Sequence, residues 1–258
     1  LCGNKKVFDG AITQLLSIVN RTKEPINYYI FTMDVTRIKE DYVKITDHQI
    51  ELLRKIATSR NQKSSVKLFD VTDIYEEEFK ECVNESAYCT PYTLLRLLAD
   101  KVDEIPDKIL YLDADIMANS DISELYNIDV TNYEFAAVRE KYGSWLISSD
   151  YFNAGVLLIN NAYWKDKGIQ QELINITERE HEHLLEADQT VLNLVMGENY
   201  VLLDDTYNFQ IGYDQLADSR GQYFIFELPL TPLPAIVHYL SADKPWNTYS
   251  VGRLREVW

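Results

Sequence analysis

The chain has 258 residues, and its 25 Lys and Arg against 41 Asp and Glu give a formal net charge of −16. This length suits one large α/β domain or two small ones, with a sizeable core. The charge excludes a general basic surface for duplex nucleic acid, because each phosphate contact needs a cation, and it disfavours broad adhesion to anionic lipid. Any phosphate chemistry must therefore use a few local cations or a metal.

Cysteine content and hydropathy indicate the compartment. Three cysteines, Cys2, Cys82 and Cys89, occur at no metal-ligand spacing, and an odd, sparse count does not make a disulfide scaffold. No apolar run approaches the roughly 20 residues of a membrane span, and the first residues lack the basic-then-apolar order of a signal peptide. We therefore expect a cytoplasmic protein without a transmembrane segment.

Helical and strand patterns alternate along the chain. In chain order they predict helix 9–22, strand 26–32, helix 46–58, strand 66–69, helix 91–102, strands 108–112, 135–138 and 155–160, helices 161–180 and 187–196, and strand 235–239. This alternation predicts an α/β fold with a mostly parallel central sheet and helices on both faces. Ligands of such sheets bind outside the carboxyl ends of the strands.

Two carboxylates follow the apolar strand 108–112. Asp113 and Asp115 lie two residues apart, and in extended backbone such residues share a face, so both can reach one ion. Hard divalent cations such as Mg²⁺ and Mn²⁺ bind oxygen ligands. The alternative is that these aspartates only cap the next turn. The spacing alone leaves both interpretations open.

A second pattern follows the last predicted strand. His238 leaves that strand, and Lys244 comes six residues later, before Pro245 and Trp246. A histidine can complete a two-aspartate site for Mn²⁺, and a lysine can contact a phosphate as a point charge. The alternative is a surface histidine and a solvated lysine.

Two further segments combine polar groups with strand or helix ends. Asn153 to Gly155 are small or polar residues entering a buried strand, which suits a backbone that a ligand approaches closely, or simply tight strand packing. Asp188 and Gln189 open a predicted helix, where Asp188 could also serve as an ordinary N-cap.

In combination these segments resemble glycosyltransferase family 8, the retaining family of bacterial lipopolysaccharide galactosyl- and glucosyltransferases, plant galactinol synthases and glycogenin. The resemblance runs from about residue 1 to 247 and rests on an Arg ahead of the signature strand, that strand with its Asp-x-Asp, a Phe-Asn-Ala-Gly segment, an Asp-Gln pair and a closing His-x5-Lys-Pro-Trp. These match Arg96, 109–115, 152–155, 188–189 and 238–246.

This resemblance implies a GT-A fold in a single catalytic domain, 1–258, with a nucleotide-binding part at about 1–115 and an acceptor and sugar part at about 116–247. It implies transfer of a hexose, glucose or galactose, from a UDP-sugar to an acceptor hydroxyl with retention, in bacterial cell-surface glycan synthesis. Mn²⁺ or Mg²⁺ would serve as cofactor. The acceptor would be a glycan or glycolipid, contact with the inner face of the membrane stays open, and no nucleic acid is expected.

The resemblance also assigns roles to residues. Asp113, Asp115 and His238 would bind the metal, and Lys244 would contact the diphosphate. The remaining nucleotide contacts would come from Cys2, Gly3, Asn4, Ala114, Gly155 and Ser241. The sugar would be held by Arg96, Asn153, Asp188 and Gln189, with Glu140 as a further acidic residue near it.

Other functions are still open from the sequence. One is a non-catalytic sugar-nucleotide or glycan-binding module on the same fold. Another is a self-glucosylating, glycogenin-like protein, for which the 18 tyrosines offer acceptors. A nucleotidyltransferase also uses paired carboxylates, but it would need a Gly-rich basic loop, and residues 1–8 hold one glycine and two lysines.

Overall fold

The computed structural model describes residues 1–79, 90–179, 187–196, 199–212, 232–240, 244–246, 254 and 257–258. Its α-helices are α1 (Phe8–Val19), α2 (Asp47–Thr58), α3 (Thr72–Glu78), α4 (Ser123–Tyr126), α5 (Gly143–Leu146), α6 (Asn161–Lys167), α7 (Ile169–Arg179) and α8 (Ala187–Met196). Its 3₁₀ segments are η1 (Lys5–Val7), η3 (Pro91–Lys101) and η4 (Asp205–Asn208). Its strands are β1 (Asn27–Thr32), β2 (Ser65–Asp70), β3 (Lys108–Leu112), β4 (Ile116–Ala118), β5 (Phe135–Arg139), β6 (Phe152–Asn160), β7 (Tyr200–Leu202), β8 (Phe209–Ile211) and β9 (Ile236–Tyr239).

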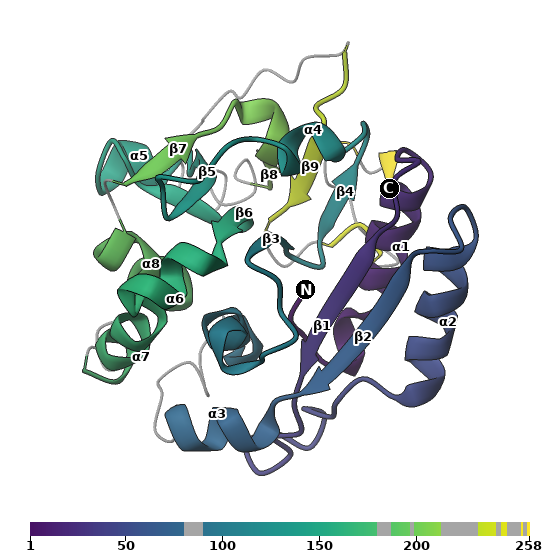
Figure 1. Ribbon diagram of the computed structural model, residues 1–258, viewed down its shortest axis with the longest axis horizontal. Coiled ribbons are helices and arrows are strands. Elements are labelled where there is room, and N and C mark those ends of the chain that lie inside the picture. The colour runs from purple at the N-terminus through teal and green to yellow at the C-terminus, as the bar shows by residue number, and fades with distance from the viewer. Residues whose placement is uncertain are drawn as a thin grey trace.

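The described strands form three sheets rather than one, in the orders β1-β2, β3-β6-β5-β7 and β4-β9-β8 (Figure 1). Three of the pairings are parallel (β1 with β2, β5 with β7, β8 with β9), and three are antiparallel (β3 with β6, β5 with β6, β4 with β9). The α/β class is confirmed, whereas the expected mostly parallel central sheet is corrected to a mixed one. A strand buried on both faces is apolar throughout whichever way it runs, so its sequence does not fix its direction.

Local sequence signals account for several element boundaries. Helix α2 begins with a capping box, in which the Thr46 side chain accepts from the Gln49 backbone while the Gln49 side chain accepts from the Thr46 backbone. The segment Pro91–Lys101 was expected as an α-helix and is wound as a 3₁₀-helix instead. Nearly all of its residues are buried, so tertiary packing rather than helix propensity sets its winding.

The largest core cluster lies where η3, β6, α6, α7 and α8 meet. It contains Leu94, Tyr111, Phe135, Phe152 and Trp164, all at most 6% exposed. Burial of apolar surface is the dominant favourable contribution to folding, and β6 is buried from Phe152 to Ile159. No helix in the described part of the chain combines the length and the apolar character needed to cross a membrane.

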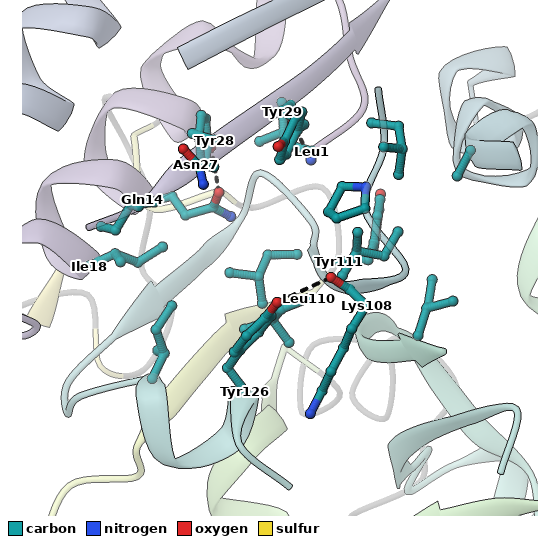
Figure 2. A pocket seen from close by; sticks show the side chains of 18 of the residues that line it. Leu1, Gln14, Ile18, Asn27, Tyr28, Tyr29, Lys108, Leu110, Tyr111 and Tyr126 are labelled. Carbon is teal, nitrogen blue, oxygen red and sulfur yellow. Dashed lines mark hydrogen bonds between the residues drawn. The ribbon is translucent and has the colours of Figure 1, made fainter. Parts of the chain in front are cut away.

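A cavity of about 570 Å³ lies between the segments of β1 and β3 (Figure 2). Its lining includes Tyr28 and Tyr29 from β1 and Leu110 and Tyr111 from β3. Residues Leu1 to Gly3 run beside β1, with Cys2 in a parallel bridge to Phe31. The Asp-x-Asp residues and His238 are not part of this lining.

Candidate active site

The two predicted metal-binding aspartates lie in the turn between β3 and β4. The turn is fixed through its backbone: Asp113 N–H donates to the Gly155 carbonyl of β6 at 2.9 Å, and the Gln14 side chain of α1 donates to the Asp113 carbonyl. Tyr239 N–H of β9 donates to the Asp115 carbonyl at 2.9 Å. Three elements far apart in sequence therefore hold this turn in place.

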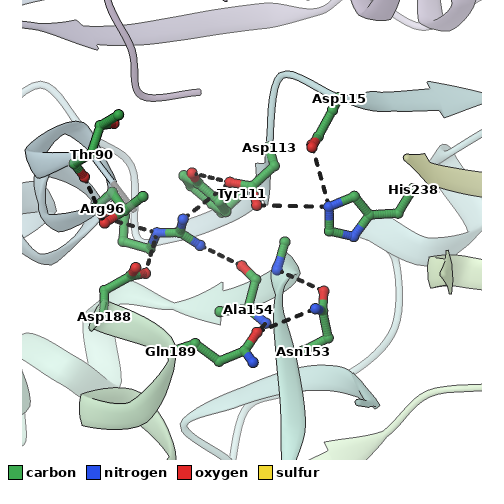
Figure 3. A network of polar contacts seen from close by, with 12 residues as sticks. Thr90, Arg96, Tyr111, Asp113, Asp115, Asn153, Ala154, Asp188, Gln189 and His238 are labelled. Atoms are coloured by element: carbon green, nitrogen blue, oxygen red, sulfur yellow. Dashed lines mark hydrogen bonds and ion pairs between the residues drawn. The ribbon is translucent and has the colours of Figure 1, made fainter. Parts of the chain in front are cut away.

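The structure brings Asp113, Asp115 and His238 together (Figure 3). One ligand atom from each lies within 4.8 Å of the others. His238 Nε2 is 3.3 Å from Asp115 Oδ1 and 3.9 Å from Asp113 Oδ2. Asp115 Oδ1 is buried and receives no well-aligned hydrogen bond from the described residues. Two carboxylates and one imidazole with such an unsatisfied oxygen fit a divalent cation of the Mn²⁺ or Mg²⁺ kind.

The two carboxylate oxygens of Asp113 have different surroundings. Oδ1 accepts from the Tyr111 hydroxyl at 2.6 Å and from Arg96 Nη2 at 3.0 Å. Oδ2 faces His238. Tyr111 thus orients Asp113 so that one oxygen is held by protein groups and the other points into the candidate metal site.

Lys244 lies against the same site. Its Nζ is 2.5 Å from Asp115 Oδ2 and donates to the Tyr239 carbonyl at 2.8 Å. Burial alone would raise the pKa of the Asp115 carboxyl, but the Lys244 ammonium and the neighbouring His238 imidazole outweigh it and hold that pKa well below its usual range. Asp115 is therefore ionised at neutral pH, as a metal ligand must be.

Arg96 is the buried centre of a second network, also drawn in Figure 3. Its side chain is 4% exposed and pairs with Asp188 at 2.9 Å and with Asp113 at 3.0 Å. It also donates to the Ala154 carbonyl, and its guanidinium lies 4.1 Å from the Tyr111 ring centroid. Each nitrogen of the guanidinium thus has a protein acceptor or carboxylate beside it, so Arg96 positions both carboxylates, and its predicted contact with a sugar stays a prediction.

Asp188 is the second residue of α8, and its carboxylate faces Arg96. Burial raises the pKa of Asp188 to about 6, because the desolvation of this carboxylate outweighs the favourable charge of Arg96, and Asp113 adds repulsion. A carboxyl with a raised pKa beside a metal site is a common feature of functional sites. In the structure this side chain makes an ion pair with Arg96.

Asn153 and Gln189 meet at the entrance of β6. Asn153 Nδ2 donates to Gln189 Oε1 at 3.2 Å, and the Ala154 backbone N–H donates to the same oxygen at 3.0 Å. The predicted sugar-binding residues Arg96, Asn153, Asp188 and Gln189 are therefore gathered at one end of β6, next to the metal-binding cluster.

Two glycines permit close packing around the site. A methyl group on Gly155 would lie 2.2 Å from His238 Cε1, so only glycine lets the imidazole lie on the β6 backbone. A methyl group on Gly10 would lie 2.5 Å from the Ala114 carbonyl oxygen and 3.2 Å from Trp246. Gly10 thereby lets α1 approach the Asp-x-Asp turn.

The predicted nucleotide contacts are only partly placed. Cys2 and Gly3 run along β1, and the Asn4 side chain accepts from Lys6 N–H and caps η1. Burial raises the pKa of the Cys2 thiol to about 11, so this thiol is protonated at neutral pH. Ala114 lies in the Asp-x-Asp turn, and Ser241 falls outside the described residues. The contacts of these residues with a nucleotide stay a prediction.

Glu140 has a structural contact in the protein. It is buried, and its carboxylate accepts from the Gly143 backbone N–H at the start of α5.

Two further residues of the site had no signal in the sequence analysis. Tyr111 was counted only as part of an apolar strand, and Asn208, which contacts both Asn153 and His238, lies in a segment without a motif. A tyrosine two residues before an aspartate at a strand end was the available clue for the first.

Comparison with known proteins identifies the family. The model for glycosyl transferase family 8 matches residues 1–250. The glycosyltransferase GlyE of Streptococcus pneumoniae is 51% identical over 152 residues, 59% of this chain and 36% of that protein. GlyF of the same organism is 30% identical over 248 residues, 95% of this chain and 56% of that protein. The chain thus spans between about a third and three fifths of these relatives.

Solved structures agree with this family. The crystal structure of GlyE superposes on 99% of the chain with a TM-score of 0.78 and 34% identity, and the match covers 58% of that protein. An active-site mutant of LgtC, Q189E, superposes with a TM-score of 0.78 at 17% identity over 99% of this chain and 91% of that one. The expected GT-A fold is thereby confirmed. Together with the match over residues 1–250, these findings show that the chain belongs to glycosyl transferase family 8.

Proposed function

We propose that this chain is the catalytic domain of a retaining glycosyltransferase that moves a hexose, glucose or galactose, from a UDP-sugar to an acceptor hydroxyl. The observation that carries the proposal is the convergence of Asp113, Asp115 and His238 beside Lys244 at the ends of β3 and β9. Family membership supports the reaction class. The compartment proposed is the cytoplasm, with a cell-surface glycan or glycolipid as acceptor.

The charge distribution supports an anionic donor. The chain carries a net charge of −16, yet a diphosphate can bind where a metal cation and Lys244 supply positive charge locally. A divalent cation held there would supply positive charge that offsets the negative charge on the diphosphate as UDP leaves. Asp113, Asp115 and His238 would hold this ion, and Lys244 would exchange its contact with Asp115 for a phosphate oxygen.

The sugar would lie on the side of Asp188 and Gln189. Asp188, once ionised, stabilises positive charge that develops on the sugar ring or holds one of its hydroxyls. Gln189 is an amide and a poor nucleophile, so its role is to position the sugar. Arg96 holds Asp188 in place through an ion pair and is itself anchored by Asp113 and the Ala154 carbonyl. We propose that the nucleotide-binding part spans about 1–115 and the acceptor and sugar part about 116–247.

Calorimetry of UDP binding tests the metal-dependent part of the proposal. We expect UDP to bind in the presence of Mn²⁺ and to lose most of its affinity in EDTA, because the diphosphate would otherwise face Asp113 and Asp115 unscreened. Equal affinity under both conditions would contradict the metal assignment.

UDP release from a panel of UDP-sugars, with Mn²⁺ and without acceptor, tests the transferase itself. Slow hydrolysis of one donor identifies the sugar. Binding of UDP without release from any donor, with or without candidate acceptors, would favour the non-catalytic binding module. Mass spectrometry of the protein after incubation distinguishes a self-glucosylating protein, whose mass would rise by hexose increments.

A further inference from the structure

Four side chains connect the metal-binding cluster to the sugar side through the interior of the protein. His238 Nδ1 lies 3.0 Å from Asn208 Oδ1, and Asn208 Nδ2 donates to Asn153 Oδ1 at 2.8 Å. Asn153 Nδ2 then donates to Gln189 Oε1 at 3.2 Å. Asn208, His238 and Asn153 are 0%, 2% and 4% exposed, so water does not compete for these contacts. Asn208 is the one member that neither the sequence nor the proposed reaction accounts for.

Two backbone N–H groups set the direction of the hydrogen bonds among these four side chains. Gly155 N–H donates to Asn153 Oδ1 at 3.0 Å, and because a backbone N–H can only donate, that atom must be the oxygen. Ala154 N–H fixes Gln189 Oε1 as an oxygen in the same way. The amide group that Asn208 turns toward Asn153 Oδ1 must therefore be its NH₂, and its oxygen must face His238.

The orientation of Asn208 determines which imidazole nitrogen of His238 carries the proton. An oxygen facing Nδ1 requires a hydrogen on Nδ1, so in the neutral ring the lone pair lies on Nε2. Nε2 is the atom that faces Asp115 Oδ1 and Asp113 Oδ2. We propose that Asn208 is a positioning residue of the metal site, which holds His238 in the Nδ1–H tautomer and so presents Nε2 as a ligand to a divalent cation.

The same series of hydrogen bonds also positions Gln189 on the sugar side. Gln189 Oε1 accepts from both Asn153 and Ala154, which holds this oxygen against β6 and leaves the Gln189 NH₂ group to donate elsewhere. A change at Asn208 is therefore transmitted in two directions, to His238 and, through Asn153, to Gln189. Groups behind a metal-bound histidine commonly fix its ring in this manner.

The first test needs neither a metal nor a variant of Asn208. Nitrogen-15 NMR of the imidazole groups in the metal-free protein, well above the ordinary histidine pKa of about 6.5, reports which nitrogen carries the proton. The signal of His238 is assigned as the one lost in His238→Gln. We expect the proton on Nδ1. A proton on Nε2 would overturn the inference, whereas the proposed transferase function would be unaffected, so the two failures are distinguishable.

The second test measures Mn²⁺ affinity without a donor. This test rests on the proposed function, because it assumes that Asp113, Asp115 and His238 bind the metal. We expect Asn208→Ala to weaken Mn²⁺ binding by about 10- to 100-fold and to change the tautomer signal of His238. Asn161→Ala is the matched control, because Asn161 is also 0% exposed and donates to a carbonyl, that of Pro106, away from the site. The control should lose comparable stability and keep the Mn²⁺ affinity.

A conservative variant separates positioning from folding. Asn208→Asp keeps an oxygen for His238 Nδ1–H but loses the donor to Asn153, so it should restore the tautomer and most of the Mn²⁺ affinity. Asn208→Ala with unchanged Mn²⁺ affinity and an unchanged His238 signal would overturn the inference. If Asn208→Ala does not fold, the tautomer in the wild-type protein and in Asn208→Asp still decides it.

Discussion

Buried charge is compensated differently in two parts of the site. The metal side comprises Asp113, Asp115, His238 and Lys244, and the sugar side comprises Arg96, Asn153, Asp188 and Gln189. On the metal side, Asp113 and Asp115 are 28% and 15% exposed, and the nearby lysine, Lys244, pairs with Asp115. On the sugar side, Arg96 and Asp188 are at most 5% exposed and pair with each other. The metal side keeps a negative charge that a cation can neutralise, and the sugar side is neutralised within the protein.

This difference indicates which half of the site needs a ligand to be complete. A buried carboxylate oxygen without an aligned donor, Asp115 Oδ1, is costly unless something binds it. On the sugar side Asp188 Oδ2 is also buried without an aligned hydrogen bond from the described residues, but it lies 2.9 Å from Arg96, whose charge compensates it. We therefore expect removal of the metal to affect Asp113, Asp115 and His238. The role of Asp188 and Gln189 should instead show in substitution variants. The two halves are joined by Arg96, which contacts a carboxylate in each.

The largest effect is expected at Asp115. Asp115→Ala removes a proposed metal ligand and should abolish Mn²⁺-dependent turnover, while the melting temperature stays close to the wild-type value because the carboxylate serves the ion rather than the core. Turnover with saturating Mn²⁺ and thermal unfolding are the measurements. Asp129→Ala is the control, since Asp129 accepts from the Thr131 backbone N–H and hydroxyl in an exposed turn and its loss should leave turnover intact.

On the sugar side, Asp188→Asn should separate binding from transfer. The variant should bind UDP with near wild-type affinity and transfer sugar more slowly by on the order of a hundredfold or more, because a charge that acts in the transition state is lost. UDP calorimetry and initial rates measure both. If Asp188 only stabilised the helix start, asparagine would replace it well and the rate would survive.

Stability should depend on pH through Asp188. Its pKa rises from 3.8 in the unfolded chain to about 6 in the folded protein, so the folded state binds this proton more tightly. The contribution is fully present below pH 3.8 and is lost as pH rises toward 6, by at most about 3 kcal/mol. Urea unfolding across this window should show the decline in the wild type and a flatter profile in Asp188→Asn. Parallel profiles would show that another group carries the dependence.

The sequence predicted which residues meet at the candidate metal site better than it predicted the residues that support them. Asp113, Asp115 and His238 could be found because a motif records residue types that chemistry requires at strand ends. The direction of the buried strand β6 could not, since an apolar run reads the same in parallel and antiparallel sheets. Asn208 could not either, because its partners come from β6 and β9 and only the tertiary fold brings them together.

Arg96 shows a further limit of sequence reasoning. The position of Arg96 in the family pattern predicted a contact with the sugar. Such a pattern gives the type of residue but not the acceptors that its N–H groups face. In the folded protein the guanidinium points at Asp113, Asp188 and the Ala154 carbonyl. Burial of an arginine requires such partners, and whether Arg96 also contacts the sugar stays a prediction.

The smallest effect is expected at Lys244, and it tests whether the metal side has two sources of positive charge. Lys244 pairs with Asp115 in the structure, and binding of UDP would give its ammonium a phosphate partner instead. Lys244→Ala removes one charge-assisted contact, typically 1.5–3 kcal/mol, but it also frees Asp115 to bind the metal more strongly. These opposite contributions should leave UDP binding weaker by about tenfold, with the Mn²⁺ requirement intact. UDP calorimetry at fixed Mn²⁺ measures the change. Lys67→Ala is the control, because Lys67 pairs with Glu104 on an exposed surface and its loss should leave UDP affinity unchanged. A Lys244→Ala protein that binds UDP as tightly as the wild type would show that the metal alone neutralises the diphosphate.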